Sequence, residues 1–290
     1  MKEMPLDIKK KIAKLQKGEI TEHYVYHIIA KRTKNEDNKK ILEQISKDEL
    51  RHYNMWADVL KTKVKPNKLK IFYFSILSFL LGYTFALKIM ERGEDQASDV
   101  YKEISEYYPQ ASQIALEEDA HEQKLIGMLD EERLSYVGSM VLGLNDALVE
   151  LSGTLAGLTF AFANTKLISL SGLITGIAAA LSMAASEYLS SKADNDPKAF
   201  KSSIYTGIAY IITVAILILP YLLLGNQFVA LGVMLFSVVL IIFLFNYYIS
   251  VAKDLEFKKR FLQMAIISLS VALISFGIGI LVKQFLGVDV

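Results

Sequence analysis

Cysteine is absent from this 290-residue chain, and its absence excludes several common metal and redox centres. Without thiolates the protein cannot form disulfides, thiolate zinc sites, iron–sulfur clusters or a rubredoxin-type iron centre. An excess of one charge is also missing, because the formal net charge is +1, so nothing favours a nucleic-acid partner. The polar segment from Met1 to Pro5 lacks an apolar stretch, and we therefore expect no cleaved signal peptide.

Charge is scarce in the second half of the chain. Residues 136–290 hold only 8 of the 31 acidic and 9 of the 32 basic side chains. The other 23 of each sign, together with all four histidines, lie in residues 1–135. This asymmetry predicts two domains, a soluble domain over 1–135 and a membrane-embedded domain over 136–290.

Helical periodicity predicts an all-α fold whose first domain is a four-helix bundle. Apolar residues recur at helical spacing within 5–32 and 35–63, with a polar break at 34–38 that suits a turn. The Lys65-Pro66-Asn67 segment is expected to end the second helix. A third helix should carry Glu91 and Glu94, and a fourth should run from about Gln110 to Arg133.

Segment 71–87 contains 17 residues without a charge, at the lower limit of a membrane-spanning length. A span at this position would place the two halves of the metal site described below on opposite sides of the membrane. We therefore interpret the segment as a buried crossover or as the start of the third helix, resting on the membrane or on a second subunit.

A pattern of carboxylates and histidines occurs twice in the first domain. In each copy a Glu-x-x-Glu pair is followed, 27 or 24 residues later, by Glu-x-x-His. This spacing places a carboxylate and an imidazole one turn apart on the same helical face. Two such pairs with further glutamates bind two iron or manganese ions in four-helix bundles. The predicted ligands are Glu19, Glu22, Glu49, His52, Glu91, Glu94, Glu118 and His121.

Two tyrosines follow predicted ligands by seven residues each, namely Tyr26 and Tyr101. They suit hydrogen-bond donors to the ligands, and ordinary core packing is the alternative. In many sites of this kind one helix supplies a single glutamate, which would be Glu19 and would leave Glu22 outside the site. The remaining histidines, His23 and His27, fit surface or core positions better than metal ligation.

These residues carry a resemblance to a known family. Residues 15–130 resemble the ferritin-like domain of the rubrerythrin family, and the resemblance implies a di-iron site that reacts with oxygen or peroxide. The chain lacks the cysteines of that family's rubredoxin module, which leaves an electron relay for peroxide reduction unsupported. The matching positions are Glu19, Tyr26, Glu49, His52, Glu91, Glu94, Tyr101, Glu118 and His121.

Five long apolar segments follow, each of a length that crosses ~30 Å of hydrocarbon. They lie at about 138–163, 167–190, 203–224, 228–250 and 261–282. Seven basic residues lie in the loops on one side and two on the other: Lys192, Lys198, Lys201, Lys253, Lys258, Lys259 and Arg260 against Lys166 and Lys283. The positive-inside rule then predicts a cytoplasmic first domain and an external C-terminus, and the family resemblance described below implies the plasma membrane of a prokaryote.

Few polar side chains interrupt the spans, and those that do suggest an ion pathway. Asp146 and Glu150 are four residues apart in the first span, on one helical face. Met183 and Glu187 are similarly spaced in the second span, and a thioether beside carboxylates suits Fe(II) better than calcium or magnesium. Charged groups in lipid usually line a functional path. Alternatively, Glu187 snorkels to the interface and Met183 packs against apolar neighbours.

A second resemblance rests on these two spans. The strings Gly143-Leu-Asn-Asp-Ala-Leu-Val and Ala180-Leu-Ser-Met-Ala-Ala-Ser-Glu-Tyr-Leu-Ser are similar to the vacuolar iron transporter family, over residues 136–285. That family implies a dimeric five-span exchanger of Fe(II) for protons, with Asp146 and Met183 as pathway ligands. Thr175 replaces a glutamate of the plant-type members, and the loop after the second span is too short for their metal-binding insert.

Taken together, the two halves resemble prokaryotic fusions of the membrane-bound ferritin type. The leading hypothesis is a proton-coupled efflux transporter for iron or manganese, acting as a homodimer, whose cytoplasmic domain binds the metal and has the ligands to oxidise it. One alternative is a membrane-anchored di-iron ferroxidase or peroxidase. Another is a sensor in which metal occupancy gates the membrane domain. The donors suit both iron and manganese.

Overall fold

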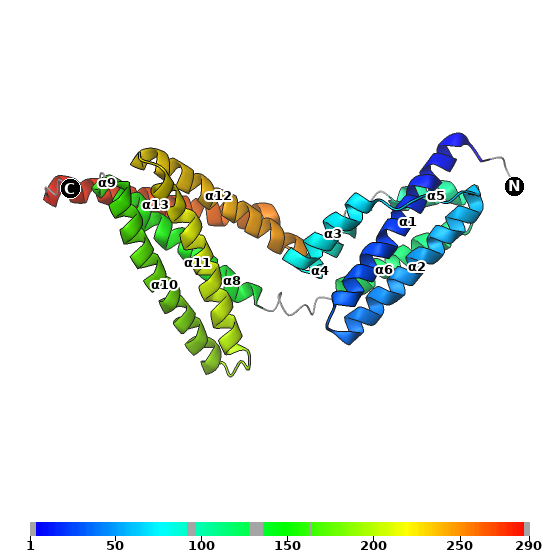
Figure 1. Ribbon diagram of the computed structural model, residues 1–290, viewed down its shortest axis with the longest axis horizontal. Coiled ribbons are helices and arrows are strands. Elements are labelled where there is room, and N and C mark those ends of the chain that lie inside the picture. The colour runs from blue at the N-terminus through cyan, green and yellow to red at the C-terminus, as the bar shows by residue number, and fades with distance from the viewer. Residues whose placement is uncertain (1–3, 92–96, 128–135, 163, 287–290) are drawn as a thin grey trace. The chain divides into compact units, whose positions relative to one another are not determined.

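Figure 1 shows the computed structural model of the chain, which describes residues 4–91, 97–127, 136–162 and 164–286. The chain divides into two compact units, Met1–Glu131 and Glu132–Val290. All regular elements of the described residues are helices. The predicted all-α class, with packed N-terminal helices followed by five long apolar helices, is confirmed.

The first unit is built from antiparallel helices, of which α1 and α2 lie side by side (Figure 1). The predicted fourth helix is described to Gly127, and its expected continuation to Arg133 lies outside the described residues. The described helices are α1 (Leu6–Arg32), α2 (Glu36–Leu60), α3 (Lys68–Leu81), α4 (Tyr83–Glu91), α5 (Ala97–Ser105) and α6 (Ala111–Gly127).

Asparagine side chains set where two of these helices begin. Asn35 accepts hydrogen bonds from two backbone amides in the first turn of α2, a usual role of Asn at a helix start. The helix ends at Leu60 because Lys61 adopts the left-handed conformation, with φ of 53°. Asn67 was expected to end α2. It instead caps α3, by accepting from the Lys70 amide.

Gly82 divides the apolar segment 71–87 into two short helices. Its φ of 93° is a conformation that favours glycine. The following helix α4 is largely buried, as expected for the start of a helix in the bundle. The preceding helix α3 buries only Phe74, so the expectation of a buried crossover is wrong for this part. With 14 and 9 residues, the two helices are shorter than the ~20 residues a span requires.

The interior of the first unit consists of two apolar clusters separated along the helices by polar residues. One cluster contains Ile12 and Trp56, and the other contains Val25 and Ile45. Glu19 lies between Ile12 and Val25 on α1, and the Glu49–His52 pair lies between Ile45 and Trp56 on α2. Packing of the apolar residues on both sides therefore fixes the helices around a buried polar layer.

Five stretches of helix in the second unit are long and apolar enough to cross a membrane. They agree with the five segments expected from the sequence. The first stretch contains a π-helical turn, η1, between two α-helices, and such turns frequently occur at functional sites. The elements are α8 (Val137–Asp146), η1 (Ala147–Leu151), α9 (Ser152–Ala161), α10 (Thr165–Ala193), α11 (Ala199–Leu223), α12 (Gln227–Ala252) and α13 (Phe257–Leu286).

Glycines allow the spans to approach one another closely within one chain. A Cβ atom added to Gly143 would lie 2.4 Å from the backbone oxygen of Thr206, on α11. A Cβ added to Gly279 would meet the backbone oxygen of Gly157 at the same distance. Small residues at such crossings let helix backbones pack tightly in lipid, and these contacts hold the first span against α11 and α13.

Candidate metal centre

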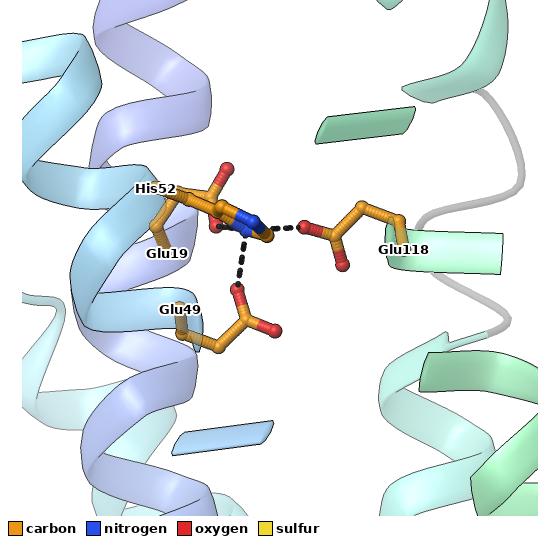
Figure 2. Close-up of side chains that lie close together, drawn as sticks. All are labelled: Glu19, Glu49, His52 and Glu118. Carbon is orange, nitrogen blue, oxygen red and sulfur yellow. Dashed lines mark ion pairs between the residues drawn. The ribbon is translucent and has the colours of Figure 1, made fainter. Parts of the chain in front are cut away.

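Three helices of the first unit bring four of the predicted ligands together. Each residue offers one ligand atom, and these atoms lie within 4.8 Å of one another. The Nδ1 atom of His52 lies 2.8 Å from Glu118, 3.5 Å from Glu19 and 3.7 Å from Glu49. Figure 2 shows Glu118 reaching toward His52 from the side opposite Glu19. The four are Glu19 on α1, Glu49 and His52 on α2, and Glu118 on α6.

The second histidine of the repeated pattern joins this group. His121 Nδ1 lies 3.1 Å from Glu49 and 3.5 Å from Glu118. The His121 and His52 rings stack with their centroids 6.0 Å apart. Both Glu-x-x-His pairs therefore face the same small volume, so that each histidine approaches glutamates of both copies.

The inward-facing atoms of this cluster lack conventional hydrogen-bond partners. Within the described part of the chain, five of the cluster's buried side-chain atoms make no hydrogen bond of ordinary geometry and meet one another only as ion pairs. Buried polar groups normally make hydrogen bonds, and burying several carboxylates together is costly. A divalent cation would satisfy all five, so the donor set fits a metal ion. The atoms are Glu19 Oε2, Glu49 Oε2, His52 Nδ1, Glu118 Oε1 and His121 Nδ1.

The outward-facing nitrogens of both histidines contact carboxylates in a crossed arrangement. His52 Nε2 donates to Glu117 at 2.7 Å, and His121 Nε2 donates to Asp48 at 3.3 Å. Arg51 contacts both carboxylates. Such contacts orient a metal-binding histidine and direct its other nitrogen toward the ion.

Asp48 and Glu117 were not among the site residues predicted from the sequence. Their signal in the sequence is an acidic residue immediately before each Glu-x-x-His glutamate. The structure shows that each of them contacts the histidine of the other copy. Periodicity within one helix gives no information on such pairing.

Electrostatics at the cluster reflect several carboxylates buried around two imidazoles. Burial, together with the nearby Glu118, raises the pKa of Glu19 well above its usual value and that of Glu49 to about 8. Burial opposes protonation of His52, but the surrounding carboxylates outweigh it and raise its pKa. For Glu118, burial is outweighed by His121 and His52, which lower its pKa. The cluster therefore holds protons that a cation would displace.

Of the other predicted ligands, Glu22 and Glu91 lie outside this cluster of four. The Glu22 carboxylate pairs with Lys70 Nζ at 3.0 Å. Glu91 accepts a hydrogen bond of 2.5 Å from the Tyr26 hydroxyl, and burial raises its pKa to about 7. Glu94 lies outside the described residues.

Two aromatic donors hold Glu19 in place. The Tyr101 hydroxyl and the Trp56 indole donate to the same Glu19 oxygen, at 3.2 Å and 3.1 Å. Tyr101 was a predicted donor, whereas Trp56 was not identified from the sequence. His23 contacts the backbone oxygen of Ser46 at 2.7 Å and, like the exposed His27, lies away from the cluster.

In the second unit, the polar residues of the first span lie at the π-helical turn. Asp146 is the last residue of α8, and Glu150 lies within η1. The wider turn alters the α-helical spacing that was assumed for this pair. Both carboxyl groups interact with the hydroxyl of the buried Tyr210 on α11, which lies 3.4 Å from Glu150. Tyr210 was not identified from the sequence, where it is one of several aromatic residues in an apolar run.

On the second span, Glu187 connects α10 to α8. Ser139 donates to the Glu187 carboxylate at 2.7 Å, and Ser191 donates to it at 3.3 Å. Met183, one turn earlier, is partly buried and packs against the apolar core of the second unit. The first two spans are therefore joined through a polar contact at Glu187.

Comparison with known proteins identifies part of the second unit. A model described as the VIT family matches residues 137–199. No curated protein and no solved structure matches the chain. The region similar to this family comprises the first two candidate spans, and it includes Asp146, Glu150, Met183 and Glu187.

Proposed function

We propose that the protein is a membrane transporter that exports Fe(II), or Mn(II), from the cytoplasm in exchange for protons. The observation that carries this proposal is the VIT family match over 137–199, which coincides with the two candidate spans that hold acidic side chains. Ionisable groups inside a membrane usually mark an ion path. A simple membrane anchor would not need them.

In this proposal the first unit collects the metal. Its Glu/His cluster offers the carboxylate and imidazole donors that suit Fe(II) and Mn(II), without the thiolates that would favour zinc. Glu19, Glu49, His52, Glu118 and His121 would bind the ion directly. Glu22, Glu91 and Glu94 are candidates for completing a second metal position.

The proposed path through the membrane begins with the side chains at the π-helical turn. Asp146 and Glu150 would bind the ion there, and Met183 and Glu187 would contribute from the second span. Protons and metal ions compete for carboxylate oxygens. Protonation from the outer side would therefore lower metal affinity and release the ion, which couples proton entry to metal export.

A homodimer is part of the proposal. Glu150 is exposed on the surface of a single chain, and an ionised carboxylate facing hydrocarbon is costly. A second copy packed against this face would enclose Glu150. The positive-inside distribution of the loops supports a cytoplasmic first unit and an external C-terminus.

The test is metal flux in proteoliposomes that contain the full chain and a pH gradient. We expect Fe(II) movement that collapses with the gradient and falls to the level of protein-free liposomes in Asp146→Ala. The exposed loop residue Asp194 provides a matched control, and Asp194→Ala should transport at the wild-type rate. Wild-type flux in Asp146→Ala would show that the pathway is wrongly assigned.

A membrane-anchored oxidase is the second candidate. Two observations favour it, namely the Tyr101 and Trp56 donors on Glu19, because oxidisable aromatic side chains lie directly beside the metal ligands. Peroxide or oxygen consumption by the full chain distinguishes the two functions. Consumption that persists unchanged in Asp146→Ala, with no flux in either protein, would favour the oxidase.

A further inference from the structure

Helix α3 presents an apolar surface that is largely exposed within the first unit. Only Phe74 is buried in this helix, whereas Leu69, Phe72 and Phe79 are 80%, 65% and 66% exposed. Contiguous apolar surface of this kind marks an interaction site more often than a neutral surface. The exposed apolar residues of the helix are Leu69, Phe72, Tyr73, Ile76, Phe79, Leu80 and Leu81.

The orientation of this surface is set by contacts on the opposite side of α3. The Asn67 amide donates to Thr21 on α1 at 2.9 Å, and Lys70 pairs with Glu22. Phe74 packs into the apolar core of the first unit. The helix is therefore a fixed part of the unit, and its apolar side chains face outward because of the fold.

A run of lysines without carboxylates accompanies the apolar surface. Residues 59–90 contain six lysines and no Asp or Glu. Lys61, Lys63, Lys65 and Lys68 lie at or just before the start of α3, and all four are exposed. Basic residues flanking an exposed apolar helix are typical of segments that bind the surface of an anionic membrane.

We propose that the outer surface of α3 and this lysine run dock the first unit onto an anionic lipid surface, with the helix lying in the membrane interface. The helix has 14 residues, which is too short to span a bilayer. Gly82 then turns the chain back into the buried helix α4. The apolar side chains would enter the headgroup region, and the lysines would contact lipid phosphates and carboxylates.

Charge favours lipid over a second copy of the chain as the occupant of this surface. A two-fold contact through α3 would bring two carboxylate-free lysine runs into one interface, where they would repel each other. An anionic lipid surface complements them. Because both units belong to one chain with five candidate spans, a bilayer is always near the first unit, which raises the effective concentration of lipid. The proposal does not depend on which ion is transported.

The absence of cysteine makes a site-specific test possible in the full chain. We would attach a fluorophore to a single cysteine in Phe72→Cys and measure its quenching by lipids carrying a spin label in the acyl chain. The protein would be placed in nanodiscs of phosphatidylcholine, with or without phosphatidylserine. The matched control is Lys47→Cys, an exposed position on α2.

We expect several-fold stronger quenching at position 72 than at position 47 in discs that contain phosphatidylserine. The difference should shrink in pure phosphatidylcholine and in a variant with K61Q, K63Q, K65Q and K68Q. These lysines are exposed, so the variant should retain the helical content of the wild type. Equal quenching at both positions in anionic discs would overturn the proposal. Protection of position 72 from lipid, with energy transfer between labels on two copies, would overturn it in favour of a dimer contact.

Discussion

The indole of Trp56 donates a hydrogen bond of 3.1 Å to Glu19, one of the four clustered donor residues. Trp56 is fully buried and is the only tryptophan in the chain. Its fluorescence therefore reports on the environment of the Glu/His cluster without an added label. An ion bound by Glu19 would alter this environment directly, and a paramagnetic ion would also quench the emission.

The carboxylate of Glu117 should control metal affinity without binding the metal. Its contact with His52 Nε2 directs Nδ1 toward the other donors. Loss of such an outer partner typically weakens metal binding by about 10–100-fold. We expect this range for Glu117→Gln when Mn(II) is titrated and Trp56 emission is followed.

The control for this variant is Glu106→Gln, which removes an exposed carboxylate of the first unit and should leave the affinity unchanged. Asp48→Asn should weaken binding as Glu117→Gln does, because Asp48 contacts His121 in the same way. Wild-type affinity in both Glu117→Gln and Asp48→Asn would show that the two histidines do not bind the ion through Nδ1.

Metal binding should strengthen as pH rises from about 6 to about 8. Burial raises the pKa of Glu49 to about 8, so near neutral pH this carboxyl group holds a proton that the metal must displace. Surrounding carboxylates raise the pKa of His52 and add a second proton. We expect about a tenfold gain in affinity per pH unit for each proton released.

The stability of the metal-free protein should change with pH in the opposite direction. A group whose pKa is raised by folding stabilises the folded state below its unfolded pKa, and that contribution is lost as pH rises through the folded pKa. For Glu49 this stability is lost between the ordinary pKa of 4.5 and the raised pKa of about 8. Thermal unfolding followed by Trp56 emission should therefore occur at lower temperature at pH 8 than at pH 6.

A metal affinity that is independent of pH would contradict the buried, protonated cluster.

Close packing of the first span should make Gly143 sensitive to a single added methyl group. In Gly143→Ala the Cβ would overlap the Thr206 backbone oxygen, and overpacking of this kind typically costs about 1–3 kcal/mol. We expect a lower unfolding temperature of the second unit in detergent, with metal binding at the first unit unchanged.

Gly138 on the same helix provides the comparison, because a Cβ added there meets no described atom within 4 Å. Gly138→Ala should match the wild type or exceed it slightly, since alanine favours helix more than glycine does. Equal stability of the two alanine variants would show that α8 and α11 do not approach as closely as the structure indicates.

Local spacing predicted several of the side chains that the structure brings together in the Glu/His cluster. Glu49 and His52 are one helical turn apart, so their common face follows from helix geometry alone. The second copy at Glu118 and His121 then indicated a shared site. The crossed contacts to Glu117 and Asp48 depend on how two helices are rotated against each other, which no single helix specifies.

The amino-acid composition of a segment did not predict which side of its helix is exposed. The apolar run 71–87 was expected to be a buried crossover or the start of the third helix, resting on the membrane or on a second subunit. Its first part, in α3, is largely exposed because other helices cover only one side. The π-helical turn between Asp146 and Glu150 also departs from the assumed α-helical spacing. Neither feature has a signature in hydrophobic periodicity.

A titration of the purified full chain tests whether the Glu/His cluster binds the transported metal ion. We expect Fe(II) or Mn(II) to quench Trp56 emission saturably in the wild type, and Glu49→Gln to weaken binding at least about tenfold, since it removes a ligand rather than an outer partner. Glu106→Gln should behave as the wild type. An unquenched Trp56, or a Glu49→Gln protein that binds metal as tightly as the wild type, would contradict the claim.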